Sequence, residues 1–150
     1  MKGICVIKSE KVNAIIKLTE QAHSTVIKGS VTGLNPNQEH AIHIHECGDL
    51  SDGCTSACAH YNPFNKNHGG PRSNERHVGD LGNIMADNNG NCEFIIHDLY
   101  VRLSGEYSVI GRSIIIHEDP DDYGLGSHED SHITGHAGKR IGCGVIGITK

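Results

Sequence analysis

Hydrophobic and polar residues alternate over short stretches of this 150-residue chain, and turn residues separate the stretches. Runs of this kind that are rich in Ile and Val are typical of β-strands, whose successive side chains face opposite sides. No segment of a dozen residues shows the 3.6-residue period of an amphipathic helix. The pattern predicts eight strands, at residues 4–7, 14–18, 25–31, 41–45, 81–85, 92–96, 113–117 and 142–148.

This arrangement predicts an all-β fold in which eight antiparallel strands form a sandwich or a barrel. Two segments, residues 46–80 and 118–139, interrupt the strands with Gly, Asn, Asp, Ser, Pro and His. Loops of this length in a compact domain usually serve a function. The length of the chain fits one domain that spans residues 1–150.

Composition and charge narrow the range of functions. The formal net charge is −5, and acidic and basic residues are intermingled, which argues against binding to nucleic acid or to anionic membranes. No apolar run reaches the roughly 18 residues of a membrane span, and the first residues are too short an apolar stretch for a secretory signal. We therefore expect a cytoplasmic protein. The chain contains 12 His and 6 Cys, so metal binding is the first hypothesis.

The strongest cluster of possible metal ligands begins with His43 and His45 in the expected strand 41–45. Residues two apart on a strand face the same side, so both imidazoles can bind one ion. An isolated pair of this kind is more often a polar strand face, and the following loop changes that interpretation. It contains four further donors, namely His60, His68, His77 and Asp80. Three His and one Asp suit a tetrahedral zinc ion.

His117, at the end of the expected strand 113–117, adds one more donor. Together with His43, His45 and His60 it completes a set of four imidazoles. Such a set suits copper in a planar or tetragonal arrangement. His60 then belongs to both sets of ligands.

At these residues the sequence resembles the copper/zinc superoxide dismutases of the eukaryotic cytosolic type. The resemblance extends from about residue 5 to residue 148 and rests on segments 43–49 (HIHECGD), 60–63 (HYNP), 68–71 (HGGP), 75–83 (ERHVGDLGN) and 140–148 (RIGCGVIGI). It implies a Greek-key β-barrel and copper and zinc as cofactors. The implied activity is the dismutation of superoxide to molecular oxygen and hydrogen peroxide.

The resemblance also implies a role for each ligand. It assigns copper to His43, His45, His60 and His117, and zinc to His60, His68, His77 and Asp80. His60 would bridge the two ions as an imidazolate, which requires loss of both ring protons. Asp121 matches a carboxylate that links a ring of the copper set, here His43, to a ring of the zinc set, here His68.

Arg140 matches the arginine that guides superoxide to copper, and its planar guanidinium suits a small anion. In the implied reaction one superoxide is oxidised and a second is reduced, and His60 can hand a proton to the forming peroxide. The channel departs from the family at two positions. Ile133 occupies a position where many relatives have lysine, and Lys139 one where a small polar residue is more usual. Their effect on the steering of the anion stays open.

The cysteines divide into one implied pair and four others. The resemblance implies a disulfide between Cys54 and Cys143. The remaining four are expected to be small, buried or half-buried thiols, and they are Cys5, Cys47, Cys58 and Cys92. A bridge between Cys47 and Cys58 stays open as an alternative.

The resemblance further implies a homodimer formed by apolar patches near residues 48, 109–111 and 147–148, and it leaves open a copper chaperone. Two non-catalytic alternatives share the fold. A copper-delivery protein typically carries an additional Cys-x-Cys motif or metal-binding domain, which this chain lacks. A zinc-bound, metal-buffering relative usually lacks a copper ligand or the arginine. The complete set of ligands therefore favours the enzyme, with Arg140 and His60 as its catalytic residues.

Overall fold

The computed structural model describes every residue from Met1 to Lys150 and consists of β-structure with almost no helix. Its elements are β1 (Lys2–Lys8), β2 (Asn13–Glu20), β3 (Thr25–Thr32), β4 (Glu39–His45), β5 (Ser51–Cys54), the 3-10 helix η1 (Thr55–Ala57), β6 (Asp80–Met85), β7 (Cys92–Asp98), β8 (Ser113–His117), α1 (Ser131–Thr134) and β9 (Arg140–Thr149). The eight strands predicted from the sequence are all present, so the predicted all-β fold is confirmed.

Eight strands form one antiparallel sheet in the order β6-β4-β8-β9-β1-β2-β3-β7. The edge strands β6 and β7 contact each other, so the sheet curls into a nearly closed barrel. The connections from β3 to β4 and from β7 to β8 pass over other strands, as in a Greek key. Because the barrel is almost closed, few backbone groups remain unpaired at its edges.

Side-chain alternation explains how the strands bury their apolar residues. In β2, Ala14, Ile16 and Leu18 are buried. Ile15, which lies between Ala14 and Ile16 in the sequence, points outward and is 52% exposed. The core combines such inward residues from all the sheet strands with buried apolar residues of the connecting segments, such as Leu103. Strand β4 differs because both of its faces are buried: Ile42 and Ile44 lie in the core, and the alternate residues face the loops.

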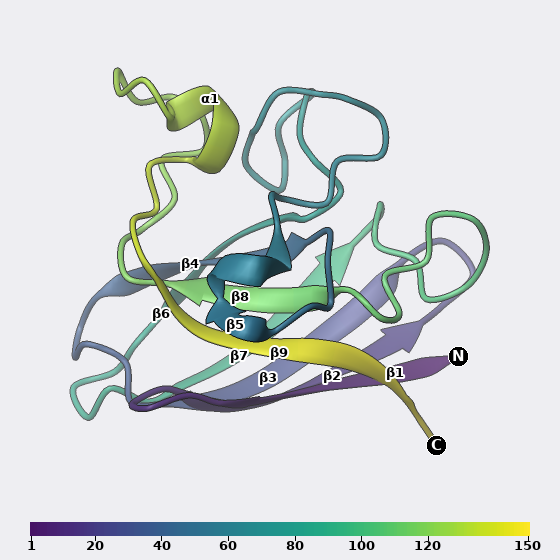
Figure 1. Ribbon diagram of the computed structural model, residues 1–150, viewed down its shortest axis with the longest axis horizontal. Coiled ribbons are helices and arrows are strands. Elements are labelled where there is room, and N and C mark those ends of the chain that lie inside the picture. Colours follow the sequence, from purple (N-terminus) through teal and green to yellow (C-terminus); the bar gives the residue numbers. More distant parts are fainter.

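Both long loops lie on the same side of the barrel, as Figure 1 shows for the teal loop around residue 65 and the yellow-green loop that contains α1. The first loop, which follows β4, includes β5 and η1, and the second includes α1. The sequence predicts no regular structure in either loop. The three elements have only four, three and four residues, and segments this short leave no periodic pattern.

Two disulfides hold the first loop. One joins Cys54 to Cys143 of β9, with 5.6 Å between the Cα atoms. The other joins Cys47 to Cys58, with 5.5 Å between the Cα atoms. The expectation of thiols at these two positions is therefore wrong, and the alternative of a bridge between them is the one that the structure shows. The sequence could not show that residues 46–47 lie beside residues 57–59, because this contact depends on the course of the whole loop. The two other cysteines are buried free thiols.

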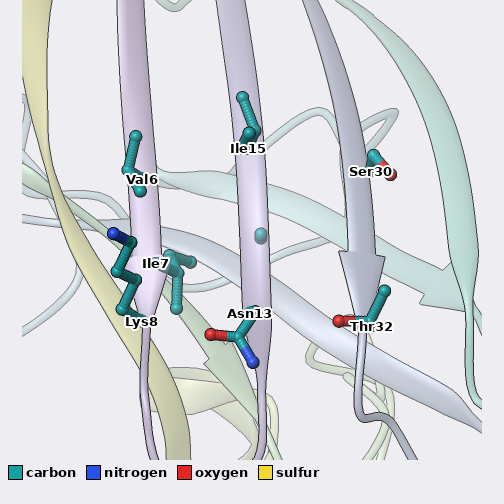
Figure 2. Close-up of a pocket in the computed structure, with 8 residues that line it drawn as sticks. Val6, Ile7, Lys8, Asn13, Ile15, Ser30 and Thr32 are labelled. Atoms are coloured by element: carbon teal, nitrogen blue, oxygen red, sulfur yellow. The ribbon is translucent and has the colours of Figure 1, made fainter.

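The outer face of β1, β2 and β3 contains a shallow hollow of about 290 Å³ (Figure 2). Figure 2 shows Val6, Ile15 and Ser30 on three neighbouring strands around it. None of its lining residues is a His, Cys, Asp or Glu, so this hollow offers none of the usual metal ligands. No helix of the structure is long or apolar enough to cross a membrane.

Candidate metal centre

Two neighbouring strands and one loop position the first group of donors. His43 and His45 extend from β4 toward the loops, and His117 ends β8, which pairs with β4. His60 reaches the group from the first loop, where its backbone pairs with that of His45 in an isolated antiparallel β-bridge. All four imidazoles are buried, and one ligand atom from each lies within 4.8 Å of the others.

One nitrogen of each ring in this group has no hydrogen-bond partner although it is buried: His43 Nδ1, His45 Nε2, His60 Nε2 and His117 Nε2. Buried polar atoms are nearly always paired, so four unpaired nitrogens at one place need a common partner. In three of the rings the other nitrogen is hydrogen-bonded: to Asp121 Oδ2 at 2.6 Å, to the Cys58 carbonyl at 2.9 Å and to the Gly138 carbonyl at 3.2 Å. These contacts fix the tautomers so that the free nitrogens present lone pairs, which suits copper.

A second group of donors surrounds one carboxylate oxygen, Asp80 Oδ1. The Nδ1 atoms of His60, His68 and His77 lie 3.0, 2.8 and 3.2 Å from it. The other carboxylate oxygen accepts hydrogen bonds from the backbone N–H groups of Gly69 and His77, which orients the side chain. Three imidazoles and one carboxylate at such distances match the ligands of a tetrahedral zinc ion.

His60 is common to both groups. Its Nε2 belongs to the first group, and its Nδ1 to the group around Asp80. A single imidazole therefore separates the two positions that a metal ion would occupy. An imidazole can serve both only when it has lost both ring protons, which two neighbouring dications favour.

Asp121 also connects the two groups, because it contacts one ring of each. Its Oδ2 accepts a hydrogen bond from His43 Nε2 at 2.6 Å, and its Oδ1 accepts one from His68 Nε2 at 2.7 Å. Asn83 holds the backbone of Asp121 through two hydrogen bonds, one in each direction. Sequence reasoning missed Asn83, because nothing in its spacing from Asp121 indicates that the two residues touch.

The pKa values of the metal-free imidazoles differ between the groups. Burial, followed by repulsion from neighbouring imidazoles, lowers the pKa of His43 well below its ordinary value. The same causes, with Arg140 nearby, lower the pKa of His45 to about 2 and that of His117 to about 4. Burial also favours neutral His68, but the carboxylates of Asp121 and Asp80 outweigh it and raise the pKa of His68 to about 9.

Arg140 lies beside the first group, because it pairs with His117 in the β8–β9 ladder. Its guanidinium donates hydrogen bonds to the carbonyls of Cys54 at 2.8 Å and Cys58 at 2.6 Å, and a longer one of 3.4 Å to Thr55. No carboxylate pairs with it, so its positive charge stays available to an anion.

The fold and the two donor groups together define a β-barrel metalloprotein with a dinuclear centre. The family described as Copper/zinc superoxide dismutase (SODC) matches residues 12–146. The chain is 52% identical to Superoxide dismutase [Cu-Zn] of Paramecium bursaria Chlorella virus 1, over 93% of this chain and 74% of that protein. It is 46% identical to Superoxide dismutase [Cu-Zn] of Candida albicans, over 100% of this chain and 99% of that protein.

A solved structure shows the same fold. The crystal structure of the clock protein EA4 is 44% identical to the chain and superimposes with a TM-score of 0.95, over 99% of this chain and 94% of that one. The chain therefore belongs to the copper/zinc superoxide dismutase family, and the resemblance found in its sequence is confirmed. Its function is superoxide dismutation with copper and zinc as cofactors.

Proposed function

We propose that this superoxide dismutase binds copper and zinc through two ligand sets that share one residue. Copper is held by His43, His45, His60 and His117, and zinc by His60, His68, His77 and Asp80. The observation that supports this assignment most strongly is the placement of His60, whose two ring nitrogens face different donor groups. The runner-up functions, copper delivery and metal buffering, do not require an imidazole in this position.

When bound, copper supplies one-electron reduction and oxidation of superoxide, and zinc, which has no accessible second oxidation state, supplies positive charge. The overall reaction consumes two superoxide ions and two protons and yields one oxygen and one hydrogen peroxide. His60 is placed to carry one of these protons at Nε2, while Nδ1 stays beside Asp80. The second proton comes from solvent.

Arg140 binds and orients the anionic substrate. Carbonyls hold part of its guanidinium in place, and the remaining N–H groups can donate to superoxide. Asp121 keeps the rings of His43 and His68 in fixed orientations, because it accepts a hydrogen bond from each. Both ligand sets thus share one orienting carboxylate in addition to the shared imidazole.

Elemental analysis of the purified, metal-loaded protein and an assay of superoxide-driven dye reduction test the proposal together. We expect one copper and one zinc per chain and inhibition of dye reduction. In Arg140→Ile, loss of a charge-assisted contact should lower kcat/KM by about tenfold or more while copper is retained. Copper-loaded protein without activity would support one of the two non-catalytic functions. An unchanged rate in Arg140→Ile would mean that the guiding role belongs to another residue.

A homodimer is the proposed assembly. Val145 and Ile148 on β9 are 40% and 70% exposed, and the glycine backbones of Gly48 and Gly111 lie against each other next to Val145. Exposed apolar side chains grouped in this way are typical of an interface between subunits. Sedimentation at micromolar concentration should give twice the mass of the chain, and a sharp monomer peak would contradict the proposal.

The proposed location is the cytoplasm. Immunoblotting of fractionated cells tests it, and recovery in a secreted fraction would contradict it. The role of a copper chaperone is tested by expressing the protein in copper-supplemented cells with and without the host chaperone. Equal copper content in the two preparations would show that loading does not require the chaperone.

A further inference from the structure

The disulfide between Cys47 and Cys58 lies directly beside two proposed copper ligands. Residues 46–47 continue β4 beyond His45, and residues 57–59 lead to His60. The two segments run side by side: Glu46 N–H donates to the Ala59 carbonyl at 2.9 Å, and Cys47 N–H donates to the Ala57 carbonyl at 3.1 Å. The disulfide therefore fastens together the two segments that deliver His45 and His60.

Cys58 has a backbone conformation that suits glycine. Its φ is +68° and its ψ is −156°. This region is populated almost only by glycine, because a Cβ atom collides with the backbone there. A free cysteine at this position would relax to a common conformation. The bridge to Cys47 supplies a covalent constraint that opposes this relaxation.

The carbonyl of Cys58 accepts two hydrogen bonds that matter for the site. His45 Nδ1 donates to it at 2.9 Å, and Arg140 Nη2 donates to it at 2.6 Å. The second carbonyl that holds Arg140 closely belongs to Cys54, which is bridged to Cys143. Each of the two short contacts of the guanidinium is thus made by a cysteine that a disulfide fixes.

We propose that the Cys47–Cys58 disulfide positions Arg140 and His45 by holding the Cys58 peptide in its glycine-like conformation. This inference rests on the proposed role of Arg140 in binding superoxide. Without the bridge and without glycine at position 58, the carbonyl turns away from both side chains. Arg140 then loses one of its two short contacts, and the ring of His45 loses the acceptor that fixes its tautomer.

Two double variants separate this positioning role from that of a simple cross-link. Cys47→Ser/Cys58→Ala and Cys47→Ser/Cys58→Gly both lack the bridge and introduce no free thiol. They differ only in the Cβ atom at position 58, which glycine omits. If conformation at this residue is what matters, the glycine variant keeps the carbonyl in place and the alanine variant does not. Mass spectrometry of non-reduced digests should verify Cys54–Cys143 in both.

For metal-loaded protein, we expect kcat/KM of the alanine variant to fall about threefold to tenfold, less than the roughly hundredfold that a 1 Å misplacement can cause. The glycine variant should regain activity to within about twofold of the parent, since glycine adopts the conformation freely. Equal losses in both variants would overturn the proposal in favour of a simple cross-link. Parental activity in the alanine variant would overturn it as well.

A readout on the metal-free protein does not depend on activity. Phenylglyoxal modifies accessible guanidinium groups, and peptide mass spectrometry reports the rate for each arginine. Modification of Arg140 should be at least about threefold faster in the alanine variant than in the glycine variant. Arg72 and Arg102, which contact neither bridged segment, are the internal references. Equal rates at Arg140 would overturn the proposal. If this order is found but Arg140→Ile keeps full activity, the positioning holds and the proposed role of Arg140 fails.

Discussion

The two donor groups of the centre use the same side chains in different electrostatic surroundings. His43, His45 and His117 extend from β4 and β8, and the free nitrogen of each ring has no hydrogen-bond partner. The second group is built from a loop around Asp80. Burial lowers the pKa values in the first group, whereas neighbouring carboxylates raise the pKa of His68 in the second.

This difference shows that the barrel and the loop prepare ligands by different means. In the strand-based group, rigid backbone and burial keep the imidazoles neutral and close together. In the loop-based group, Asp80 attracts the rings and compensates positive charge, so the carboxylate itself organises the loop. Variants that disturb either the strand-based group or the carboxylate of Asp80, and leave the other intact, can test this distinction.

The largest effect should come from removing one ligand of each group. His45→Ala should lose copper and keep zinc, because its ring belongs only to the strand-based group. Asp80→Ala should lose zinc more than copper and should loosen the loop, since three rings and two backbone N–H groups lose their partner. Each matched affinity should fall by more than about a hundredfold, beyond what outer contacts contribute. Competition with chelators measures both, and equal loss of both metals in both variants would contradict the distinction.

Asp121→Asn should weaken both groups together. An amide has only one acceptor oxygen, so it cannot accept from the N–H groups of His43 and His68 at once. We expect the affinity for each metal to fall about tenfold to a hundredfold. Asp122→Asn is the control, because this neighbouring carboxylate accepts from Ser131 and contacts neither ring. A loss confined to one metal would show that Asp121 does not couple the groups.

The stability of the metal-free protein should fall on both sides of about pH 6.5, for opposite reasons. His45 and His117 have folded pKa values of about 2 and 4, so below 6.5 the unfolded chain takes up protons that the folded protein does not. Each of these two histidines then lowers the free energy of unfolding by about 1.4 kcal/mol per pH unit. His68, with a folded pKa of about 9, stabilises the folded state below 6.5, and this contribution is lost as the pH rises toward 9.

Urea unfolding at pH 5 to 9 in the presence of a chelator measures this profile. His45→Gln should flatten the acidic side, and His68→Gln should flatten the alkaline side. If His45→Gln instead changed only the alkaline side, the assignment of the two environments would be reversed.

The sequence predicted the eight sheet strands because the period of two in burial is a local property. The same local rule placed His43 and His45 on one face of β4. It could not show that Cys47 and Cys58 meet, because their contact depends on how the loop returns along the end of β4. The positive φ of Cys58 was likewise invisible, since glycine, the residue that signals such a conformation, is absent there.

The metal ligands illustrate the same limit. Residue types and spacing suggested two sets of donors, and the resemblance to a family assigned each residue to a set. Which nitrogen of each ring stays free depends on acceptors that come from other segments, such as the Gly138 carbonyl beside His117. These contacts follow from packing of the second loop, and no pattern within the loop encodes them.

Removal of the charge of Lys139, which lies next to Arg140 in the sequence, should have the smallest effect on activity. Lys139 is exposed, has no carboxylate partner and lines the same surface hollow as Arg140. Ile133 in the second loop is 62% exposed but carries no charge. A cation at this rim attracts superoxide against the formal net charge of −5. Lys139→Gln should therefore lower kcat/KM about twofold at low salt, and the difference should vanish when salt screens the rim.

Lys17→Gln on β2 is the matched control, because it removes the same charge from an exposed position on a strand that contributes no residue to either donor group. Pulse-radiolysis rates at several ionic strengths compare the two variants with the parent. Steering by Lys139 predicts a weaker salt dependence in Lys139→Gln than in Lys17→Gln, since only a charge near the entrance acts on the anion within a Debye length of about 10 Å. Equal salt dependence in both variants would mean that net charge alone sets the rate. Lys139 would then not contribute to the attraction of superoxide to the strand-based group.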